Sequence, residues 1–175
     1  KTAPEAKTRP GVPSGIIGQK LEILTEPQDK EFRNKVEGLT HYLTSRSFEF
    51  RGKPNDSLKH LDAAAKADPK QEAVVILAAR RYLQKKKTDK AIEILRFAQA
   101  SNIETAAINE WLGLAYQQAN QLDAAIEEFE NAIEKEQPTL ISIRGLTKIH
   151  SSAKRLDKAF EVLEISLKKN IKEAE

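Results

Sequence analysis

Cysteine and methionine are both missing from this chain of 175 residues. Without cysteine, the protein has no disulfide bond, no thiolate metal site and no cysteine nucleophile. Methionine is missing even from position 1. This predicts that the chain lacks its natural start, either because it was processed or because it is part of a longer protein.

Long apolar runs are missing too. No stretch approaches the roughly 20 apolar residues that a membrane-spanning helix needs. Hydrophobic residues nevertheless make up 39% of the chain and charged residues 31%, which is typical of a soluble globular protein with a real core. Two locations fit these facts. One is a soluble domain behind an N-terminal signal or membrane anchor, extracytoplasmic or membrane-tethered; the other is the cytoplasm.

The residue patterns of catalytic and metal sites are also missing. The histidines have neither an i, i+4 histidine partner nor the clustered carboxylates of a zinc site; they are His41, His60 and His150. Gly11, Gly15 and Gly18 are not followed by the Lys-Ser/Thr of a phosphate-binding loop. We therefore predict that the chain is not an enzyme and that it holds no cofactor and no metal.

The first 24 residues differ from the rest. Prolines, glycines and basic residues are interspersed as far as Gly18. Proline lacks a backbone donor and glycine loses much chain entropy on folding, so we predict a flexible arm over residues 1–24 and a helical repeat domain over residues 25–175. The apolar residues of Ile16–Leu24 have two interpretations, packing against their own domain or docking elsewhere.

Beyond the arm, the sequence repeats with a period of 34 residues. Small residues occupy three columns: Ser45, Ala79, Gly113 and Thr147; Ser57, Ala91, Ala125 and Ala159; Ala64, Ala98, Ala132 and Ser166. Larger apolar residues form a fourth column, Leu61, Leu95, Phe129 and Leu163. Side chains with rings form a fifth, Phe48, Tyr82, Tyr116 and His150. Columns that keep register over four copies indicate a genuine internal repeat.

Small residues at a fixed spacing predict close helix crossings. Two antiparallel helices approach closely only where small side chains meet, and bulky residues beside the crossing fill the remaining space. A single helical hairpin cannot bury its apolar face alone, so neighbouring hairpins must stack. The fold class predicted from the repeat is therefore an all-α array of stacked antiparallel hairpins.

The best copy of the repeat resembles the tetratricopeptide repeat (TPR) family. It contains Trp111-Leu112-Gly113-Leu114-Ala115-Tyr116, followed by Asp123-Ala124-Ala125-Ile126, Phe129 and Ala132. The family pattern is W-x₂-L-G-x₂-Y…A-x₃-F…A-x₄-P. This copy departs from it in two ways, since Trp111 adjoins Leu112 and Pro138 falls one place late. The resemblance covers four repeats, at about 38–71, 72–105, 106–139 and 140–173.

The resemblance implies a right-handed α-solenoid whose first helices line a concave groove. Its expected function is that of a non-catalytic scaffold, which binds an extended peptide or a helix of a partner protein within a larger assembly. The groove positions implied are Leu39, Tyr42, Arg46, Ala73, Ile76, Arg80, Ala107, Glu110, Leu114, Gln117, Ile141, Arg144 and Lys148. The alternative for the positive residues among them is that they are only solvated.

One subtype of the family can be compared directly. Chaperone-binding TPR domains grip a terminal carboxylate with a lysine/asparagine/arginine clamp. The matching positions in the first three repeats are Tyr42, Arg46, Leu77, Ala107 and Trp111, and those one repeat later are Ile76, Arg80, Trp111, Ile141 and Gly145. Neither set keeps the clamp, so the sequence disfavours a chaperone co-factor role through it.

The turns between the two helices of a repeat carry basic residues, at Arg51, Lys53, Lys85, Lys86, Lys87, Lys154 and Arg155. They predict a basic edge suited to nucleic acid, an acidic protein or anionic lipid, although solvated turns are the commoner interpretation. Nucleic acid is disfavoured because few aromatics are expected on the surface to stack bases. Residues 106–139 carry seven acidic residues and one basic residue, between net-positive repeats. That alternation also suits self-association into a homo-oligomer.

Overall fold

A computed structural model describes residues 30–135 and 139–171 of the chain. Packing divides the chain into two units, residues 1–33 and 34–175. Of the first unit only Lys30–Arg33 are described, as the first turn of a helix. The predicted arm over residues 1–24 lies outside the described residues.

Every regular element in the described ranges is an α-helix. The first helices of the hairpins are α2 (Lys30–Phe50), α4 (Glu72–Gln84), α6 (Ala106–Gln118) and α8 (Leu140–Ser152). The second helices are α3 (Pro54–Ala67), α5 (Thr88–Ala100), α7 (Leu122–Lys135) and α9 (Leu156–Ile171). Both series step by 34 residues, except that α2 begins earlier than residue 38. The predicted helical array and its repeat boundaries at 72, 106 and 140 are thus confirmed.

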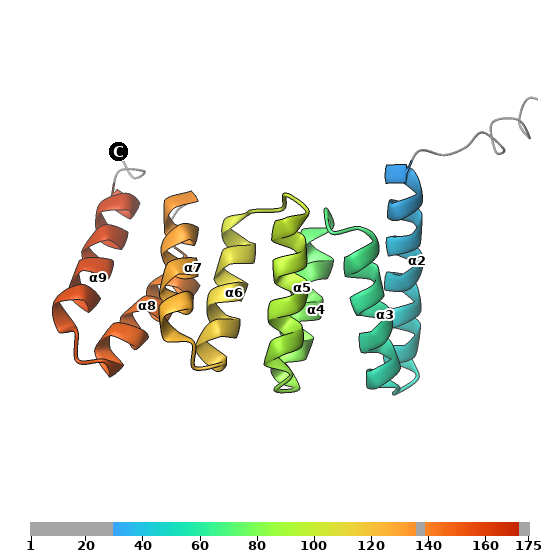
Figure 1. The fold of residues 1–175 in the computed structure, drawn as a ribbon, viewed down its shortest axis with the longest axis horizontal. Helices are drawn as coiled ribbons and strands as arrows, with labels where there is room; N and C mark the ends of the chain where they lie inside the picture. Colours follow the sequence, from blue (N-terminus) through green and yellow to red (C-terminus); the bar gives the residue numbers. More distant parts are fainter. Residues whose placement is uncertain (1–29, 136–138, 172–175) are drawn as a thin grey trace, which may run out of the picture. The chain divides into compact units, whose positions relative to one another are not determined.

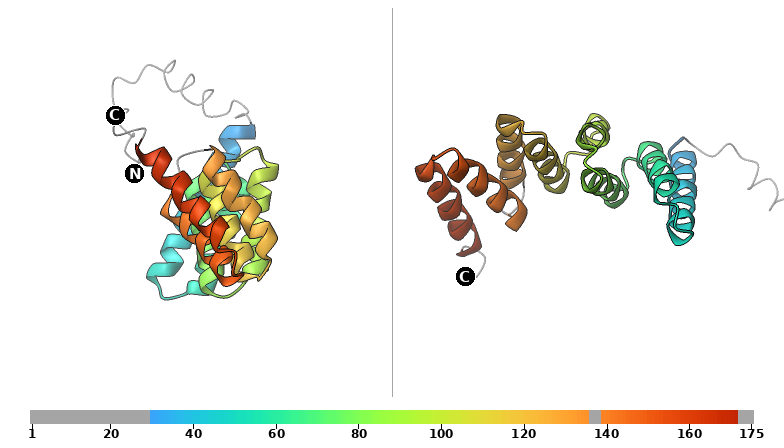
Figure 2. Two further views of the ribbon diagram at one scale, coloured as in Figure 1. Left: turned by 90° about the vertical axis from the view of Figure 1, so that its left-hand side faces the viewer. Right: turned by 90° about the horizontal axis from the view of Figure 1, so that it is seen from below.

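Consecutive helices of the second unit run in opposite directions and pack side by side (Figures 1 and 2). Each hairpin contacts the next one, and α6 also packs directly against α4 and α8. The small columns explain these contacts. Ser45 Oγ lies 3.1 Å from Ser57 Oγ where α2 crosses α3, and Ala79 and Ala91 are fully buried at the equivalent place. The second unit is therefore an α-solenoid.

The turns within the hairpins repeat as strictly as the helices. A residue with positive φ occurs at the same place in each, at Gly52, Lys86, Asn120 and Lys154, with φ between 57° and 67°. Glycine adopts this left-handed conformation freely and asparagine tolerates it, but lysine is strained in it. The turn geometry is thus imposed by the packing of the helices that flank it.

Candidate functional site

The first helices of successive hairpins enclose shallow hollows between them. The central hollow lies between α4 and α6 and has a volume of about 530 Å³. It is lined by Glu72, Ala73, Ile76, Leu77 and Arg80 of α4 and by Trp111 of α6. Arg80 is exposed, and within the described part of the chain it makes no ion pair or hydrogen bond. An apolar floor, an accessible indole and an unpaired guanidinium therefore meet at one place.

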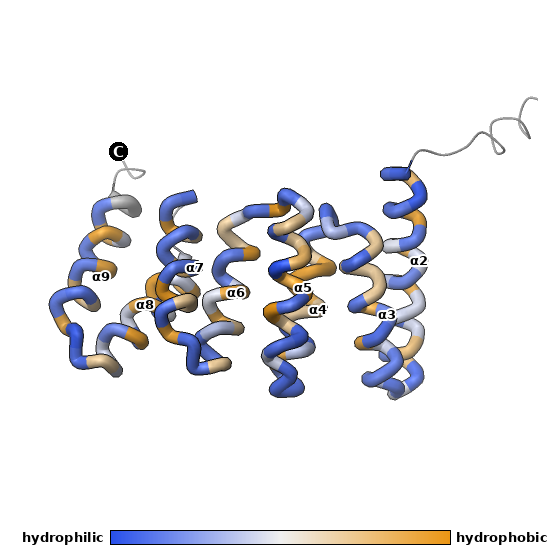
Figure 3. Tube along the Cα trace, in the orientation of Figure 1, coloured by the Kyte–Doolittle hydropathy of each residue, from blue (hydrophilic) through white to orange (hydrophobic). Residues whose placement is uncertain are grey.

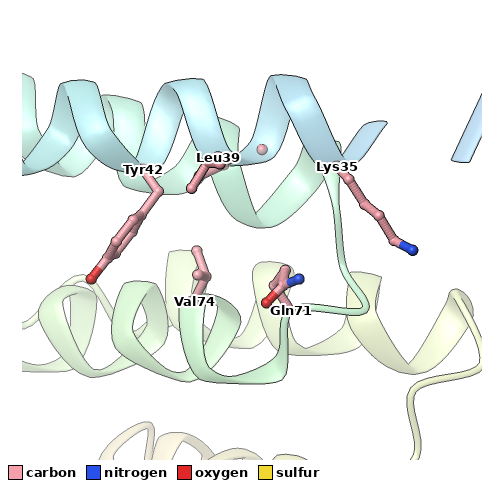
Figure 4. A pocket seen from close by; sticks show the side chains of 7 residues that line it. Lys35, Leu39, Tyr42, Gln71 and Val74 are labelled. Atoms are coloured by element: carbon pink, nitrogen blue, oxygen red, sulfur yellow. The ribbon is translucent and has the colours of Figure 1, made fainter. Parts of the chain in front are cut away.

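A second hollow lies between α2 and α4 (Figure 4) and has a volume of about 300 Å³. Leu39 and Tyr42 of α2 extend towards Val74 and Gln71 of α4. This hollow is largely apolar, with hydroxyl and amide groups at its rim. It therefore suits a hydrophobic side chain of a ligand.

A third hollow, of about 350 Å³, lies between α8 and α9. Arg144 and Lys148 line it together with Leu140, Ile143 and Leu163. Both cations are exposed and, among the described residues, neither forms an ion pair. Leu163 comes from α9, so this hollow belongs to the last hairpin alone.

The predicted groove residues are thus divided among separate hollows. Leu39 and Tyr42 line the hollow between α2 and α4, Ile76 and Arg80 the central one, and Arg144 and Lys148 the one on α8. Three further residues on α6 and α8 are half-buried: Leu114, Gln117 and Ile141. Whether these surfaces bind one continuous ligand stays a prediction.

Two of the predicted groove residues are engaged inside the protein. Glu110 was expected on the groove surface, but it is 5% exposed and accepts a hydrogen bond from Thr139 Oγ1. Thr139 also caps α8 by accepting from the backbone N–H of Ile141, so the carboxylate of Glu110 holds this cap in place. Arg46 is exposed, yet its guanidinium donates to Glu49 at 2.6 Å, and Glu49 also accepts from Arg81.

Trp111 is not among the groove positions that the sequence predicts, although it lines the central hollow with Leu77. The sequence feature that could have placed Trp111 at the hollow is its departure from the family pattern. Gly113 places the tryptophan of W-x₂-L-G at position 109. Asn109 is buried there instead, and no hydrogen bond from a described residue reaches its Oδ1. A tryptophan two residues later on the helix is turned by about 200° from that core position. It therefore faces outward.

The basic edge is exposed but interrupted. Arg51, Lys53, Lys85, Lys86, Lys87, Lys154 and Arg155 all lie exposed in turns at the same ends of their hairpins. These turns are at the lower ends of the helices in Figure 3, in hydrophilic blue. The equivalent turn between α6 and α7, residues 119–121, has no charged residue. The Nζ of Lys85 donates to Asn55 Oδ1 at 2.6 Å, so one of the seven cations links two neighbouring hairpins.

Ionisable groups with shifted pKa values lie at the junctions between repeats. Tyr82 of α4 donates to Asp62 of α3 at 3.0 Å, and burial together with this carboxylate raises the pKa of Tyr82 well above its usual range. One repeat later, Tyr116 accepts from Arg96 Nε at 2.9 Å. These contacts fasten hairpins to one another, which is a structural role.

At the next junction the ring column holds His150, which is 3% exposed. The sequence position equivalent to Asp62 is Glu130, and it lines a hollow with His150, Lys158 and Glu161. Burial lowers the pKa of His150, and the positive charges of Arg155 and Lys158 lower it further. Its burial in the ring column indicates that His150 is a packing residue.

No group of three or more histidine, aspartate and glutamate side chains is placed to hold a metal ion within the described ranges. In the same part of the chain, no helix is long and apolar enough to cross a membrane.

Comparison with solved structures identifies proteins of the same fold. A crystal structure of MamA matches with a TM-score of 0.64 at 21% identity, over 91% of this chain and 88% of that chain. A double mutant, MamA RS-1 ArsTM, matches with a TM-score of 0.63 at 17% identity, over 91% and 93%. The first TPR of Spaghetti (RPAP3), bound to the HSP90 peptide SRMEEVD, matches with a TM-score of 0.58 at 20% identity, over 68% and 94%. At such identities the likeness concerns the fold, an α-solenoid.

The family follows from the sequence of the central hairpins. A model of the tetratricopeptide repeat family matches residues 76–141. These residues belong to the tetratricopeptide repeat family, and the hairpins on both sides repeat their fold, which confirms the resemblance seen in the sequence. A comparison with curated proteins gave no significant match.

Proposed function

We propose that this chain is a non-catalytic protein-interaction scaffold that binds an extended peptide or a helix along its first helices. The central hollow between α4 and α6 is its main contact. The observation that carries this proposal is the meeting of Arg80, Ile76 and Trp111. Tryptophan and arginine are both enriched among the residues that contribute most of the binding energy at protein interfaces.

The neighbouring hollows extend this surface in both directions. A ligand side chain can enter the apolar hollow beside Tyr42, while carboxylates of the same ligand pair with Arg80 or Arg144. One solved relative of the same fold is bound to a peptide, which supports this mode of binding. Because the carboxylate clamp is missing here, we expect an internal segment of the partner to bind.

The alternative is that the basic edge binds nucleic acid or an anionic surface. Its exposed turns favour this, since Lys86 and Lys154 keep a cation in a strained backbone conformation. The uncharged turn between α6 and α7 argues against it, because it leaves a gap in the positive edge. Binding in the central hollow therefore depends on Arg80, whereas binding at the basic edge depends on turn residues such as Arg51.

The test compares two charge reversals in the full chain. Arg80→Glu changes the central hollow, and Arg51→Glu changes an exposed turn of the basic edge. Partners are captured from the source organism with the wild-type chain, identified by mass spectrometry and then titrated against each variant. We expect Arg80→Glu to weaken binding of the partner at least tenfold and Arg51→Glu to leave it nearly unchanged. Equal binding by both variants and wild type would contradict the groove, and loss only with Arg51→Glu would favour the edge.

A further inference from the structure

Inside the array, one apolar position on each second helix is covered by the following hairpin. Leu61, Leu95 and Phe129 hold this position in the first three repeats, and their exposed fractions are 3%, 0% and 0%. Leu163 is the equivalent residue of α9, and it is 39% exposed. The difference arises because no described hairpin follows α9.

The covering residue also has a fixed place in the repeat. At the third junction it is Gly145 of α8, where a Cβ would lie 2.5 Å from the ring of Phe129. Stepping back by the 34-residue period gives Trp111 as the equivalent residue at the second junction and Leu77 at the first, and both are half-buried against the core. One more step gives Leu43 of α2, which is 58% exposed. The array therefore presents an unused covering residue on its first helix and an uncovered one on its last.

These two leucines are the complementary pair that the first internal junction already uses. There, Leu61 is buried and Leu77 is half-buried against the same core, so each side of the junction holds a leucine. Leu43 and Leu163 offer the same two side chains. Packing of matched volume is what a close contact between helices needs.

The surroundings of both leucines are apolar as well. Leu156, Phe160 and Leu167 follow the spacing of one helix face with Leu163, and all three are exposed. On α2, the exposed apolar residues Val36 and Phe50 lie seven residues to either side of Leu43. The hollow of about 350 Å³ on α8, to which Leu163 contributes, lies where the first helix of a further hairpin would pack. Exposed apolar surface of this kind marks an interaction site.

Charges near Leu43 and near Leu163 give mixed support for a contact between these two faces. At the first junction Lys85 donates to Asn55, and the equivalent pair at an added junction would be Arg51 and Asp157, which are oppositely charged. Lys66 donates to Glu93, and there the equivalent pair would be Lys168 and Lys59, which repel. One attraction and one repulsion nearly cancel, so the apolar contact decides.

We propose that a second copy of this chain packs its α2 onto α8 and α9 of the first, so that Leu43 covers Leu163 and the array continues from copy to copy. The contact is head-to-tail, and each added copy leaves the same two faces free. Association therefore grows with concentration into chains of copies. Moderate salt leaves it nearly unchanged, because apolar burial drives it.

The experiment places one charge on each face of the full chain. Leu43→Asp blocks the first helix and Leu163→Asp blocks the last. Phe97→Asp, on a partly exposed residue of α5, is the matched control. Light scattering during size-exclusion chromatography measures mass over a range of concentrations, and circular dichroism checks that each variant stays folded. We expect wild type and the control to associate, and each end variant alone to stay monomeric.

Mixing the two end variants separates head-to-tail contact from its alternatives. Each mixture contains one intact first helix and one intact last helix, so we expect a species of twice the monomer mass that grows no further. A symmetric contact between two α9 helices would instead survive Leu43→Asp, so that variant would already be dimeric alone and mixing would add no further dimer. That result, or a wild-type chain that stays monomeric at every concentration, would overturn the proposal.

Because the chain has no cysteine, cross-linking gives a second measurement that does not depend on the charged variants. Leu43→Cys and Leu163→Cys are prepared separately and then mixed under mild oxidation. Head-to-tail contact predicts that the mixture forms a disulfide-linked dimer at least several-fold faster than either variant alone. Equal rates for the mixture and the separate variants would contradict it.

Discussion

The ring of Phe129 lies against Gly145, in the space that a side chain at that position would fill. The same ring covers Gly113 of α6, where a Cβ would lie 2.6 Å from it. Phe129 of α7 is therefore held between two glycines on the flanking helices. Neither glycine has a side chain, and the large ring of Phe129 fills the space that this leaves.

This relationship predicts that Gly145→Ala destabilises the protein, although alanine is the better helix former. Helix propensity alone would favour alanine by about 1 kcal/mol. The added methyl group would overlap the Phe129 ring, and overpacking of this kind costs about 1–3 kcal/mol. We expect a net loss of unfolding free energy, measured by urea denaturation.

Phe129→Leu provides the control for Gly145→Ala. Leucine is the residue found at this position in the other three repeats, and it leaves room for a methyl group. Alone it should destabilise through the cavity that it creates. Together, the two substitutions should cost less than the sum of their separate effects. Strict additivity would show that the ring and the glycine do not share space.

A buried histidine predicts a loss of stability in acid. Because burial lowers the pKa of His150 in the fold, protonation favours the unfolded chain, whose histidine titrates near 6.5. Its penalty is absent above that pH and grows as the pH falls towards the folded pKa. His150→Phe restores the aromatic column and removes a buried Nδ1 that finds no hydrogen-bond partner among the described residues. We expect the variant to be more stable by about 1 kcal/mol at neutral pH, and by more at pH 5.

Thermal unfolding across this pH range measures the effect. His41 and His60 are present in both proteins, so the difference between wild type and His150→Phe isolates the buried ring. Glu130 and Glu161 face His150 and favour its protonation, whereas Arg155 and Lys158 oppose it. A difference that does not change with pH would show that His150 titrates alike in both states.

The junction between α5 and α7 contains a buried carboxylate that pairs with an arginine. Glu128 has a side chain that is 4% exposed, and Arg96 lies 3.1 Å from it. Burial raises the pKa of Glu128, and the attraction of Arg96 only partly offsets this. The raised pKa means that its charge costs stability as the pH rises through that pKa. Arg96→Met should therefore destabilise the fold by about 1–2 kcal/mol at neutral pH, since it leaves the carboxylate unpaired.

A double-mutant cycle separates the ion pair from the packing of the arginine stem. Glu128→Gln keeps an acceptor near Gln99 and needs no cation, so we expect it to be neutral or stabilising. In that background Arg96→Met should cost less than in wild type. The same cost in both backgrounds would assign the effect to the contact of Arg96 with the ring of Tyr116.

The strained turn between α4 and α5 predicts a stabilising substitution. Lys86 has a φ of 57°, a conformation that costs a residue with a side chain about 1–2 kcal/mol. Lys86→Gly relieves this strain, and the flexibility of glycine in the unfolded chain cancels part of the gain. We expect a net gain of about 0.5–1 kcal/mol in unfolding free energy. Lys87→Gly, at a φ of −93°, should lower stability, and a similar gain there would show that strain is not the cause.

The fold could be predicted from the sequence because the 34-residue period is a regular pattern of small and large residues. Small residues at Ala79 and Ala91 and the large column through Leu95 predict where helices cross and which hairpins stack. Residues on the surface of the first helices carry no such constraint. The period cannot show that Arg46 pairs with Glu49, nor that Glu110 is drawn inward by Thr139. Those outcomes depend on single polar contacts, which vary from one repeat to the next.

The outward turn of Trp111 supplies a test of the central hollow that needs no ligand. It is the only tryptophan of the chain, so its fluorescence reports on this place alone. Iodide is an anion, and the unpaired charge of Arg80 should concentrate it near the indole, whereas acrylamide is neutral. Arg80→Glu should therefore reduce quenching by iodide roughly twofold at low salt and leave quenching by acrylamide unchanged. Arg51→Glu changes the net charge equally but lies in a distant turn, so it should affect neither quencher. If both variants reduced iodide quenching alike, the net charge of the protein, and not Arg80, would set the electrostatic potential at Trp111. That result would contradict the expectation that the central hollow attracts acidic ligands.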